Sequence, residues 1–431
     1  MSTASFSAAS ASWMREHTHP LASLEADAPL DDLEPLRDIV GDARVVAIGE
    51  GAHFVDEFAR TRQRVARFLA ERCGFTVLAA EHGFPEAPEL DDWVSGRTPG
   101  GTLREVDPRT ADWGGSYLLE WLRRHNCASS CPLRFAGIDV PRAGSTLRPA
   151  LEPLQRYFAA VDPDSAGFAR TALEISEEFL AGLGSQASAA PAWARLPTAR
   201  QDALTAALAR LHLRLRSLRP LLVERGGEAE YDRAERLVAA ACHTDYMFRA
   251  AHELFSGGGL SADTSVRDRY MAETVRWQLD RAGEGARIVL AAHNNHIQKC
   301  PVEFDGVLTA LPMGQQLTRM FGEDYASIGV THTGSTIPEM FPDEAVPLGF
   351  TVSEVELADP PPGSVEAGLV EAGLGGRATL TDLRHAPVAS DGSPSFTETR
   401  TQSSTIRTPM PGAFDAVIST PAATKDPTVA F

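Results

Sequence analysis

Four short apolar segments of the chain each end at a polar or ionisable residue. They read VVAIGEGAH at 45–53, TVLAAEH at 76–82, RFAGID at 134–139 and IVLAAHNNH at 288–296. Short runs of small and β-branched residues that break at glycine or at a charge are typical of buried parallel strands. We therefore predict four strands of one sheet, each with its polar residues at the carboxyl end.

Segments with helical periodicity separate these strands. The apolar positions after Asp56 recur at helical spacing until Gly74, which predicts a helix capped by Asp56 and ended by Gly74. A second helical stretch, WLRRHN, precedes the third strand. This alternation predicts an α/β fold, with a mostly parallel central sheet flanked by helices.

The pattern changes between residues 146 and 256, where Ala-, Leu-, Arg- and Glu-rich stretches carry helical periodicity and almost no strand signal. We interpret 146–256 as a large helical insertion that forms a lid. Residues 1–145 would then form the first part of the α/β core and residues 257–420 the second part. Residues 421–431 are expected to form a flexible tail.

Further strands are predicted after the insertion, at 325–332, 349–357 and 414–420. Residues 385–409 and 420–428 are rich in Ser, Thr and Pro. This composition predicts a loop and a frayed tail.

Composition narrows the possible partners. The 431 residues are 43% hydrophobic and 23% charged, which is enough for a large core, and the net charge is −18. A negative charge disfavours nucleic acid, because phosphate binding needs Lys and Arg. No apolar run has membrane-spanning length, no signal peptide is evident, and five irregularly spaced cysteines fit a reducing cytoplasm. We expect a cytoplasmic protein with a small-molecule substrate and neither a nucleic-acid nor a membrane partner.

Ionisable residues gather at the predicted carboxyl ends of the strands, where ligands of open α/β sheets bind. The candidates are Glu50, His53, Glu81, Asp139, His293 and His296. Singly, most of them have a structural reading as helix-start acids, surface histidines or polar strand ends. Two histidines separated by two asparagines at a strand exit have no evident packing purpose, however. Arg62 lies two turns into the first helix among other arginines, where the residues alone favour a solvated helix face.

Several common catalytic motifs are absent from the sequence. There is no GxSxG, HExxH, GxGxxG or Walker pattern. A cluster of His and Glu without a covalent nucleophile suits direct activation of water by a general base, or a metal held by histidines and carboxylates.

Six blocks of the sequence, in order, resemble the erythromycin esterase family. They are GEGAHFVDEFARTR at 49–62, AAEHGFPE at 79–86, FAGIDVPRAG at 135–144, SGGGLSADTSVRDRYMAETVRW at 256–277, VLAAHNNHIQK at 289–299 and LTALPMGQQL at 308–317. The resemblance implies a carboxylic ester hydrolase that opens macrolide lactones without a metal or other cofactor, an activity that gives antibiotic resistance.

The resemblance also implies roles for individual residues. The family's base histidine falls on His53, and its other functional residues fall on Glu50, Glu81, Arg62, His293 and His296. Because the family's functional arginine falls on Arg62, the resemblance favours a functional role for Arg62 over the reading as part of a solvated helix face. We further expect substrate contacts from residues in the matching blocks, namely Asp139, Arg142 and Tyr270.

In the expected mechanism, a neutral His53 oriented by a carboxylate removes a proton from water that attacks the ester. Arg62 or His293 would stabilise the oxyanion, another histidine could protonate the leaving group, and which histidine is the base and which is the acid stays open. Two alternatives also stay open. One is a hydrolase of the same fold acting on another ester, lactone or amide in a biosynthetic pathway. The other is a metal- or haem-binding protein that uses the histidine cluster.

Overall fold

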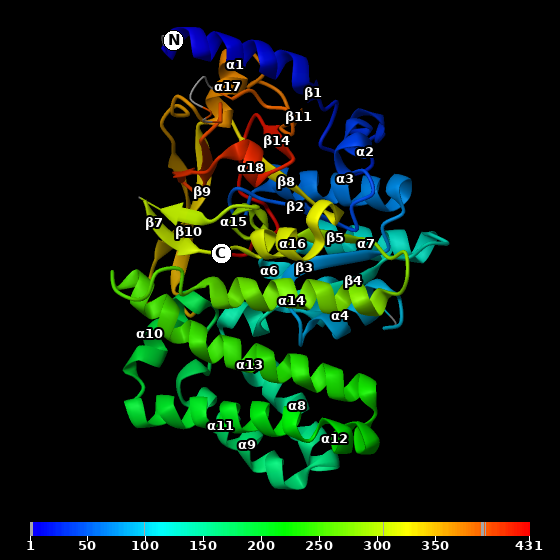
Figure 1. Cartoon of the computed structure of the whole chain (residues 1–431), viewed down its shortest axis with the longest axis vertical. Coiled ribbons are helices and arrows are strands. Elements are labelled where there is room, and N and C mark those ends of the chain that lie inside the picture. Colours follow the sequence, from blue (N-terminus) through cyan, green and yellow to red (C-terminus); the bar gives the residue numbers. More distant parts are fainter. Residues whose placement is uncertain (1–2, 99, 305, 389–391, 393) are drawn as a thin grey trace.

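The computed structural model describes residues 3–98, 100–304, 306–388, 392 and 394–431. Within this part of the chain the centre is an eight-stranded sheet in the order β1-β11-β14-β8-β2-β5-β3-β4 (Figure 1). The six strands from β14 to β4 run parallel, while β1 and β11 pair antiparallel at one edge. In sheet order the bounds are Thr18–Pro20, Thr379–Asp382, Ala416–Thr420, Tyr325–His332, Val45–Ile48, Ile288–Ala291, Val77–Gly83 and Arg134–Asp139. The predicted α/β class is confirmed.

The four strands predicted from the apolar runs are neighbours in this sheet. Ile48 of β2 lies opposite Ala291 of β5, and Ala80 of β3 lies opposite the same residue from the other side. The carboxyl ends of these strands are therefore level. The residues that follow them reach one rim, as the sequence predicts.

A bulge interrupts β3 close to this rim. Ala80 pairs with Gly137 of β4, but the next pair is Gly83 with Asp139, so that Glu81 and His82 together face a single residue of β4. The predicted strand ended at Glu81, whereas β3 continues to Gly83. A bulge of this kind re-aims a side chain, and here it leaves Glu81 free to reach toward β5.

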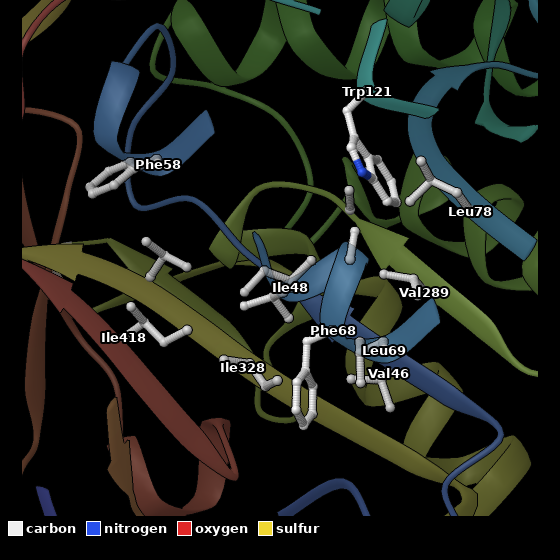
Figure 2. Close-up of a cluster of buried hydrophobic side chains, with 14 of the residues drawn as sticks. Val46, Ile48, Phe58, Phe68, Leu69, Leu78, Trp121, Val289, Ile328 and Ile418 are labelled. Atoms are coloured by element: carbon white, nitrogen blue, oxygen red, sulfur yellow. The ribbon is translucent and has the colours of Figure 1, made fainter. Parts of the chain in front are cut away.

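Helices cover both faces of the sheet because the strands alternate their side chains between two cores. Val46 and Ile48 belong to one core, and Val45 and Ala47 belong to the other. Figure 2 shows the first core, in which β2, β8 and β14 side chains lie near Phe68 of α3. The helices of the α/β part are α1 Thr3–His17, α2 Pro35–Val40, α3 Asp56–Cys73, α4 Ala87–Val94, α5 Leu103–Val106, α6 Pro108–Asp112, α7 Ser116–Ala128, α14 Ser265–Ala282, α15 Asn294–Ile297, α16 Met313–Phe321, α17 Val365–Glu371 and α18 Met410–Ala413.

Helices also fill the segment predicted as an insertion, and they share a separate apolar core. They are α8 Arg148–Val161, α9 Pro163–Leu180, α10 Gln186–Arg195, α11 Thr198–Ser217, α12 Arg219–Gly226 and α13 Glu228–Phe255. Figure 1 shows this layer beyond α14, which contacts both α13 and β4. None of the helices in the described ranges is long and apolar enough to cross a membrane. The division into domains stays a prediction.

One local expectation is wrong, and one predicted strand lies outside the central sheet. The helix α3 is capped by Val55 rather than Asp56, whose carboxylate instead accepts a hydrogen bond from Arg60 one turn later, although Gly74 ends the helix in the left-handed conformation as predicted. The predicted strand at 349–357 is β10, Phe350–Glu356, but it pairs with β9, Thr336–Pro342, outside the central sheet. Another separate hairpin joins β6 and β7, Val302–Phe304 and Val307–Ala310.

The segment 385–409, predicted as loop, contains a hairpin of β12, Glu398–Thr401, and β13, Ser404–Arg407. The composition misled the prediction because threonine is β-branched and favours strands as much as it favours polar loops. Thr399 and Thr401 are buried in this hairpin.

The last residues of the chain lie beside the start of α3. The backbone N–H of Asp56 donates to Thr424, that of Asp426 donates to Phe54, and that of Ala430 donates to Asp112. The segment expected as a flexible tail thus runs along the loop that follows β2.

Candidate active site

The loop after β2 brings a carboxylate, an imidazole and a guanidinium together. His53 Nδ1 lies 2.9 Å from Glu50 Oε1, and Arg62 Nη1 lies 2.9 Å from Glu50 Oε2. Arg62 Nε also donates to the carbonyl oxygen of Gly49 at 3.0 Å. Arg62 therefore turns from α3 toward the loop and does not lie on a solvated helix face.

The electrostatics of this group favour an ionised Glu50. Burial opposes the charge, but Arg62 and the hydrogen bond from His53 outweigh it and lower the pKa of the carboxyl. An ionised carboxylate only accepts hydrogen bonds, so His53 carries its proton on Nδ1. The other ring nitrogen of His53, Nε2, is then free to act as a base.

Gly49 allows the loop to approach the end of β5. A Cβ atom at this position would lie 1.8 Å from Asn294 Oδ1. The Asn294 side chain accepts from the N–H of Val330 and donates to its carbonyl oxygen, and so ties the end of β5 to β8. Asn294 has a structural role within the HNNH motif.

His293 faces His53 from the end of β5, with ring centroids 4.8 Å apart. The strand itself ends at Ala291, and His293 caps the short helix α15 by accepting a hydrogen bond from the N–H of Asn295 on Nδ1 at 3.1 Å. Burial and the neighbouring His53 lower the pKa of His293 to about 3. His293 is therefore neutral, with its proton on Nε2, and this buried nitrogen has no hydrogen-bond partner.

His296 has the opposite environment. Its Nδ1 lies 2.8 Å from Asp268 Oδ1 and its Nε2 lies 3.5 Å from Glu81 Oε1. Burial opposes protonation, but the two carboxylates outweigh it and raise the pKa of His296 to about 9. His296 is a buried cation between two carboxylates, and it has no free ring nitrogen for proton transfer.

Glu81 joins the two histidines to α14. One carboxylate oxygen accepts the backbone N–H of His293 at 2.9 Å, and the other accepts from Arg267 Nη2 at 2.8 Å. Burial opposes the charge on Glu81, yet His296 and Arg267 hold the pKa of this carboxyl far below its ordinary value. Arg267 also binds both oxygens of the fully buried Asp139, at 2.6 and 2.9 Å.

Arg267 and Asp268 were not among the residues predicted for the site. Both lie in the first turns of α14, within the block SGGGLSADTSVRDRYMAETVRW. The signal was weak, because charged residues at the start of a helix are common on exposed faces. Here both side chains are directed to the site.

His53 is the most open of these side chains. Its side chain is 34% exposed, against 15% for Glu50 and 17% for Glu81, while His293 is buried. Solvent can therefore reach the ring of His53, whereas the side chains that contact it are largely enclosed.

A metal site needs several donor atoms directed at one point. Each histidine has a nitrogen directed at a carboxylate or a backbone N–H rather than at a shared point. In the described residues there is no group of three or more His, Cys, Asp or Glu side chains arranged to hold a metal ion. The metal-binding alternative thus lacks an arranged ligand set in this part of the chain.

Comparison with known proteins decides the family. The model of the family described as erythromycin esterase matches residues 70–423. The chain is 33% identical to erythromycin esterase type II of Escherichia coli over 366 residues, which cover 84% of this chain and 86% of that protein. It is 34% identical to erythromycin esterase type I of Escherichia coli over 407 residues, covering 93% and 96%. The chain belongs to the erythromycin esterase family.

The fold agrees with this membership. A mutant of the erythromycin esterase EreC, solved in its open conformation, matches with a TM-score of 0.87 and 33% identity over 96% of this chain and 100% of that one. The resemblance drawn from six sequence blocks is confirmed, and the protein is a carboxylic ester hydrolase.

The three residues that we expected to contact substrate have different positions in this esterase. Asp139 is buried against Arg267 and the N–H of Val140. Arg142 is half exposed at the end of β4. Tyr270 is fully buried, and its hydroxyl donates to the carbonyl oxygen of Arg236 between α13 and α14. The structure brings Asp139 to the site as the partner of Arg267, and it does not bring Tyr270 there.

Proposed function

We propose that this protein opens the lactone ester of a macrolide by hydrolysis, with His53 as the general base and without a metal, and thereby gives antibiotic resistance. The observation that carries the proposal is the pair of Glu50 and His53. The 2.9 Å contact fixes the proton on Nδ1 and leaves an exposed Nε2. A positioned imidazole is the side chain most often used for this kind of proton transfer.

In the proposed reaction, His53 Nε2 takes a proton from water as the water oxygen adds to the ester carbonyl. The carbonyl oxygen becomes an oxyanion. The Nε2–H of His293 is buried, faces His53 and lacks a partner, so it is available to donate to that oxyanion. One such donor is typically worth about 3 to 4 kcal/mol in the transition state. The protonated His53 then returns its proton to the departing alkoxide, and the ester bond breaks.

The remaining groups hold these two imidazoles in place. Arg62 binds Glu50, which orients His53. Glu81 accepts the backbone N–H of His293, and Arg267 and His296 balance its charge. This division of roles assigns the base and the oxyanion donor to His53 and His293, which the sequence left open. We also propose the helices of 146–256 as a lid, since one of them, α13, packs on α14, which carries Arg267.

The macrolide substrate is inferred from the names of the relatives, erythromycin esterases type I and type II. Incubation with erythromycin and other 14-membered lactones, followed by mass spectrometry, is expected to show the gain of one water. A panel of linear aryl esters and amides tests the alternative substrate. Hydrolysis of an aryl ester with every macrolactone left intact would replace the macrolide assignment.

The matched control for this panel is His53→Ala. Removal of the base is expected to lower kcat by roughly 100- to 10,000-fold. The variant is expected to fold, because the side chain is partly exposed in a loop. Circular dichroism and the thermal midpoint check that expectation. A wild-type rate in this variant would mean that the base lies elsewhere, with His293 as the next residue to test.

A further inference from the structure

The turn between β12 and β13 reaches the loop that carries His53. The side-chain oxygen Oε1 of Gln402 accepts the backbone N–H of His53 at 2.7 Å. In return, the backbone N–H of Gln402 donates to the carbonyl oxygen of Gly51 at 2.7 Å. Two hydrogen bonds thus join the loop after β2 to a residue near the other end of the chain.

The backbone conformation of Gln402 is one that disfavours a residue with a side chain. Gln402 is the first residue of a two-residue hairpin loop and has φ of +49°. Glycine is preferred at such a position, since a side chain in the left-handed region costs roughly 1 to 2 kcal/mol. A glutamine at this position makes the turn less stable than a glycine would, but its side chain accepts the hydrogen bond from His53.

A carboxylate on β9 holds the Gln402 side chain in this direction. Its amide Nε2 lies 3.3 Å from Glu339 Oε1 on β9. The same carboxylate accepts the N–H of Ser403 at 2.7 Å through Oε2 and the N–H of Met340 at 2.7 Å through Oε1. Glu339 thereby fixes which end of the amide faces His53, with the oxygen toward the loop and the nitrogen toward the carboxylate.

We propose that Gln402, oriented by Glu339, is a positioning residue for His53. The proposal rests on the proposed function of His53 as the general base. Gln402 fixes the backbone at His53, while Glu50 fixes its ring. Both constraints are needed to aim Nε2 at the attacking water. Small misplacements of a catalytic group lower the rate strongly, by up to about 100-fold for 1 Å.

The substitution Gln402→Gly separates positioning from stability. Glycine suits the positive φ and retains the backbone bond to Gly51, but it removes the acceptor for His53. We expect kcat to fall roughly 10- to 100-fold with KM within about threefold, while the thermal midpoint stays at or above the wild-type value. A residue with a merely structural role would lose stability and activity together.

A charge swap provides the rescue. Gln402→Glu keeps an acceptor oxygen but places a carboxylate against Glu339, and we expect kcat to fall. The double variant Gln402→Glu with Glu339→Gln restores an amide–carboxylate pair with the roles exchanged. The amide nitrogen of residue 339 cannot accept the N–H of Met340, so we expect the double variant to recover part of the lost rate. Failure of the double variant to exceed Gln402→Glu would overturn the role of Glu339.

The matched control is Ile406→Val, which loosens the buried side of the same hairpin without touching the loop. It is expected to lower the thermal midpoint and leave kcat near wild type. Loss of rate in Ile406→Val equal to that in Gln402→Gly would mean that hairpin packing, not the side-chain acceptor, matters. Equal kcat in Gln402→Gly and wild type would also overturn the proposal.

Hydrogen exchange gives a readout that needs no substrate. The amide of His53 is expected to exchange at least tenfold faster in Gln402→Gly than in wild type, and to be unchanged in Ile406→Val. If wild type hydrolyses no lactone or ester, the proposed function fails, and the exchange rates still decide whether Gln402 holds His53. If the amide of His53 exchanges at the wild-type rate in Gln402→Gly, Gln402 does not position His53, even if the enzyme is active.

Discussion

At the residue scale, three histidines within one site have different neighbours and different exposure. His53 pairs with one carboxylate and is open to solvent, His293 is buried beside another imidazole, and His296 is enclosed by Asp268 and Glu81. Identical side chains are thereby suited to the three proposed roles of base, neutral hydrogen-bond donor and fixed cation. Environment, more than residue type, separates these three roles.

The charge on His296 predicts how stability depends on pH. Burial disfavours its protonation, but Asp268 and Glu81 raise its pKa from 6.5 to about 9 in the folded protein. Between these two values the folded state holds a proton that the unfolded state has released. The stabilisation from His296 is thus fully present below the unfolded value and is lost as the pH rises through the folded one.

We expect the free energy of unfolding of wild type to fall over this range more steeply than that of His296→Gln, which has no group to titrate there. Urea unfolding of both proteins at several pH values measures the two slopes. Parallel slopes would show that His296 does not hold the extra proton.

At the scale of elements, one guanidinium links the start of α14 to two strands of the sheet. Arg267 binds Asp139 at the end of β4 and Glu81 in the bulge of β3. The register shift in β3 matters here, because it frees Glu81 to reach Arg267 and the N–H of His293 on either side. The position of α14 and the position of His293 are therefore linked through one carboxylate.

Removal of this guanidinium is expected to be costly. Arg267→Met leaves the fully buried carboxylate of Asp139 without its partner, which typically costs about 3 to 5 kcal/mol. The double variant Arg267→Met with Asp139→Asn removes the uncompensated charge and should recover part of that loss. Urea unfolding of the single and double variants checks both statements. A single variant as stable as wild type would contradict the link between α14 and the sheet.

At the scale of the whole molecule, the polar strand ends could be predicted because an apolar strand followed by an ionisable residue has a clear sequence pattern. Glu50, His53 and His293 were found in this way, and they do meet. Helical periodicity, in contrast, does not tell which residue of a helix turns toward a site. For this reason Arg267 was overlooked and Tyr270 was given a substrate contact that the structure does not offer.

Gln402 had even less signal in the sequence. It lies in a stretch whose Ser- and Thr-rich composition hid the hairpin, and its contact with His53 spans most of the chain. Local patterns carry no information on such pairings. The fold class and the strand ends could therefore be predicted, whereas the residues that orient His53 from other elements could not.

The activity of the whole protein is expected to survive removal of metal ions. The proposed base acts on water directly, whereas a metal-bound hydroxide would be lost with its metal. Prolonged treatment with EDTA or phenanthroline should leave the rate unchanged, and elemental analysis of untreated protein should find no stoichiometric zinc. Loss of turnover that returns on addition of zinc would contradict the general-base assignment.

The position of β14 has a consequence for synthesis. This strand comes last among the strands in sequence, yet it lies inside the sheet between β8 and β11. All eight residues of β8 are buried in the folded protein. Until Ala416–Thr420 has left the ribosome, the edge of β8 that pairs with β14 has no partner. The nascent chain therefore carries an exposed template for intermolecular pairing from the time β8 is made until β14 emerges, and this late stage of synthesis is the one most prone to aggregation.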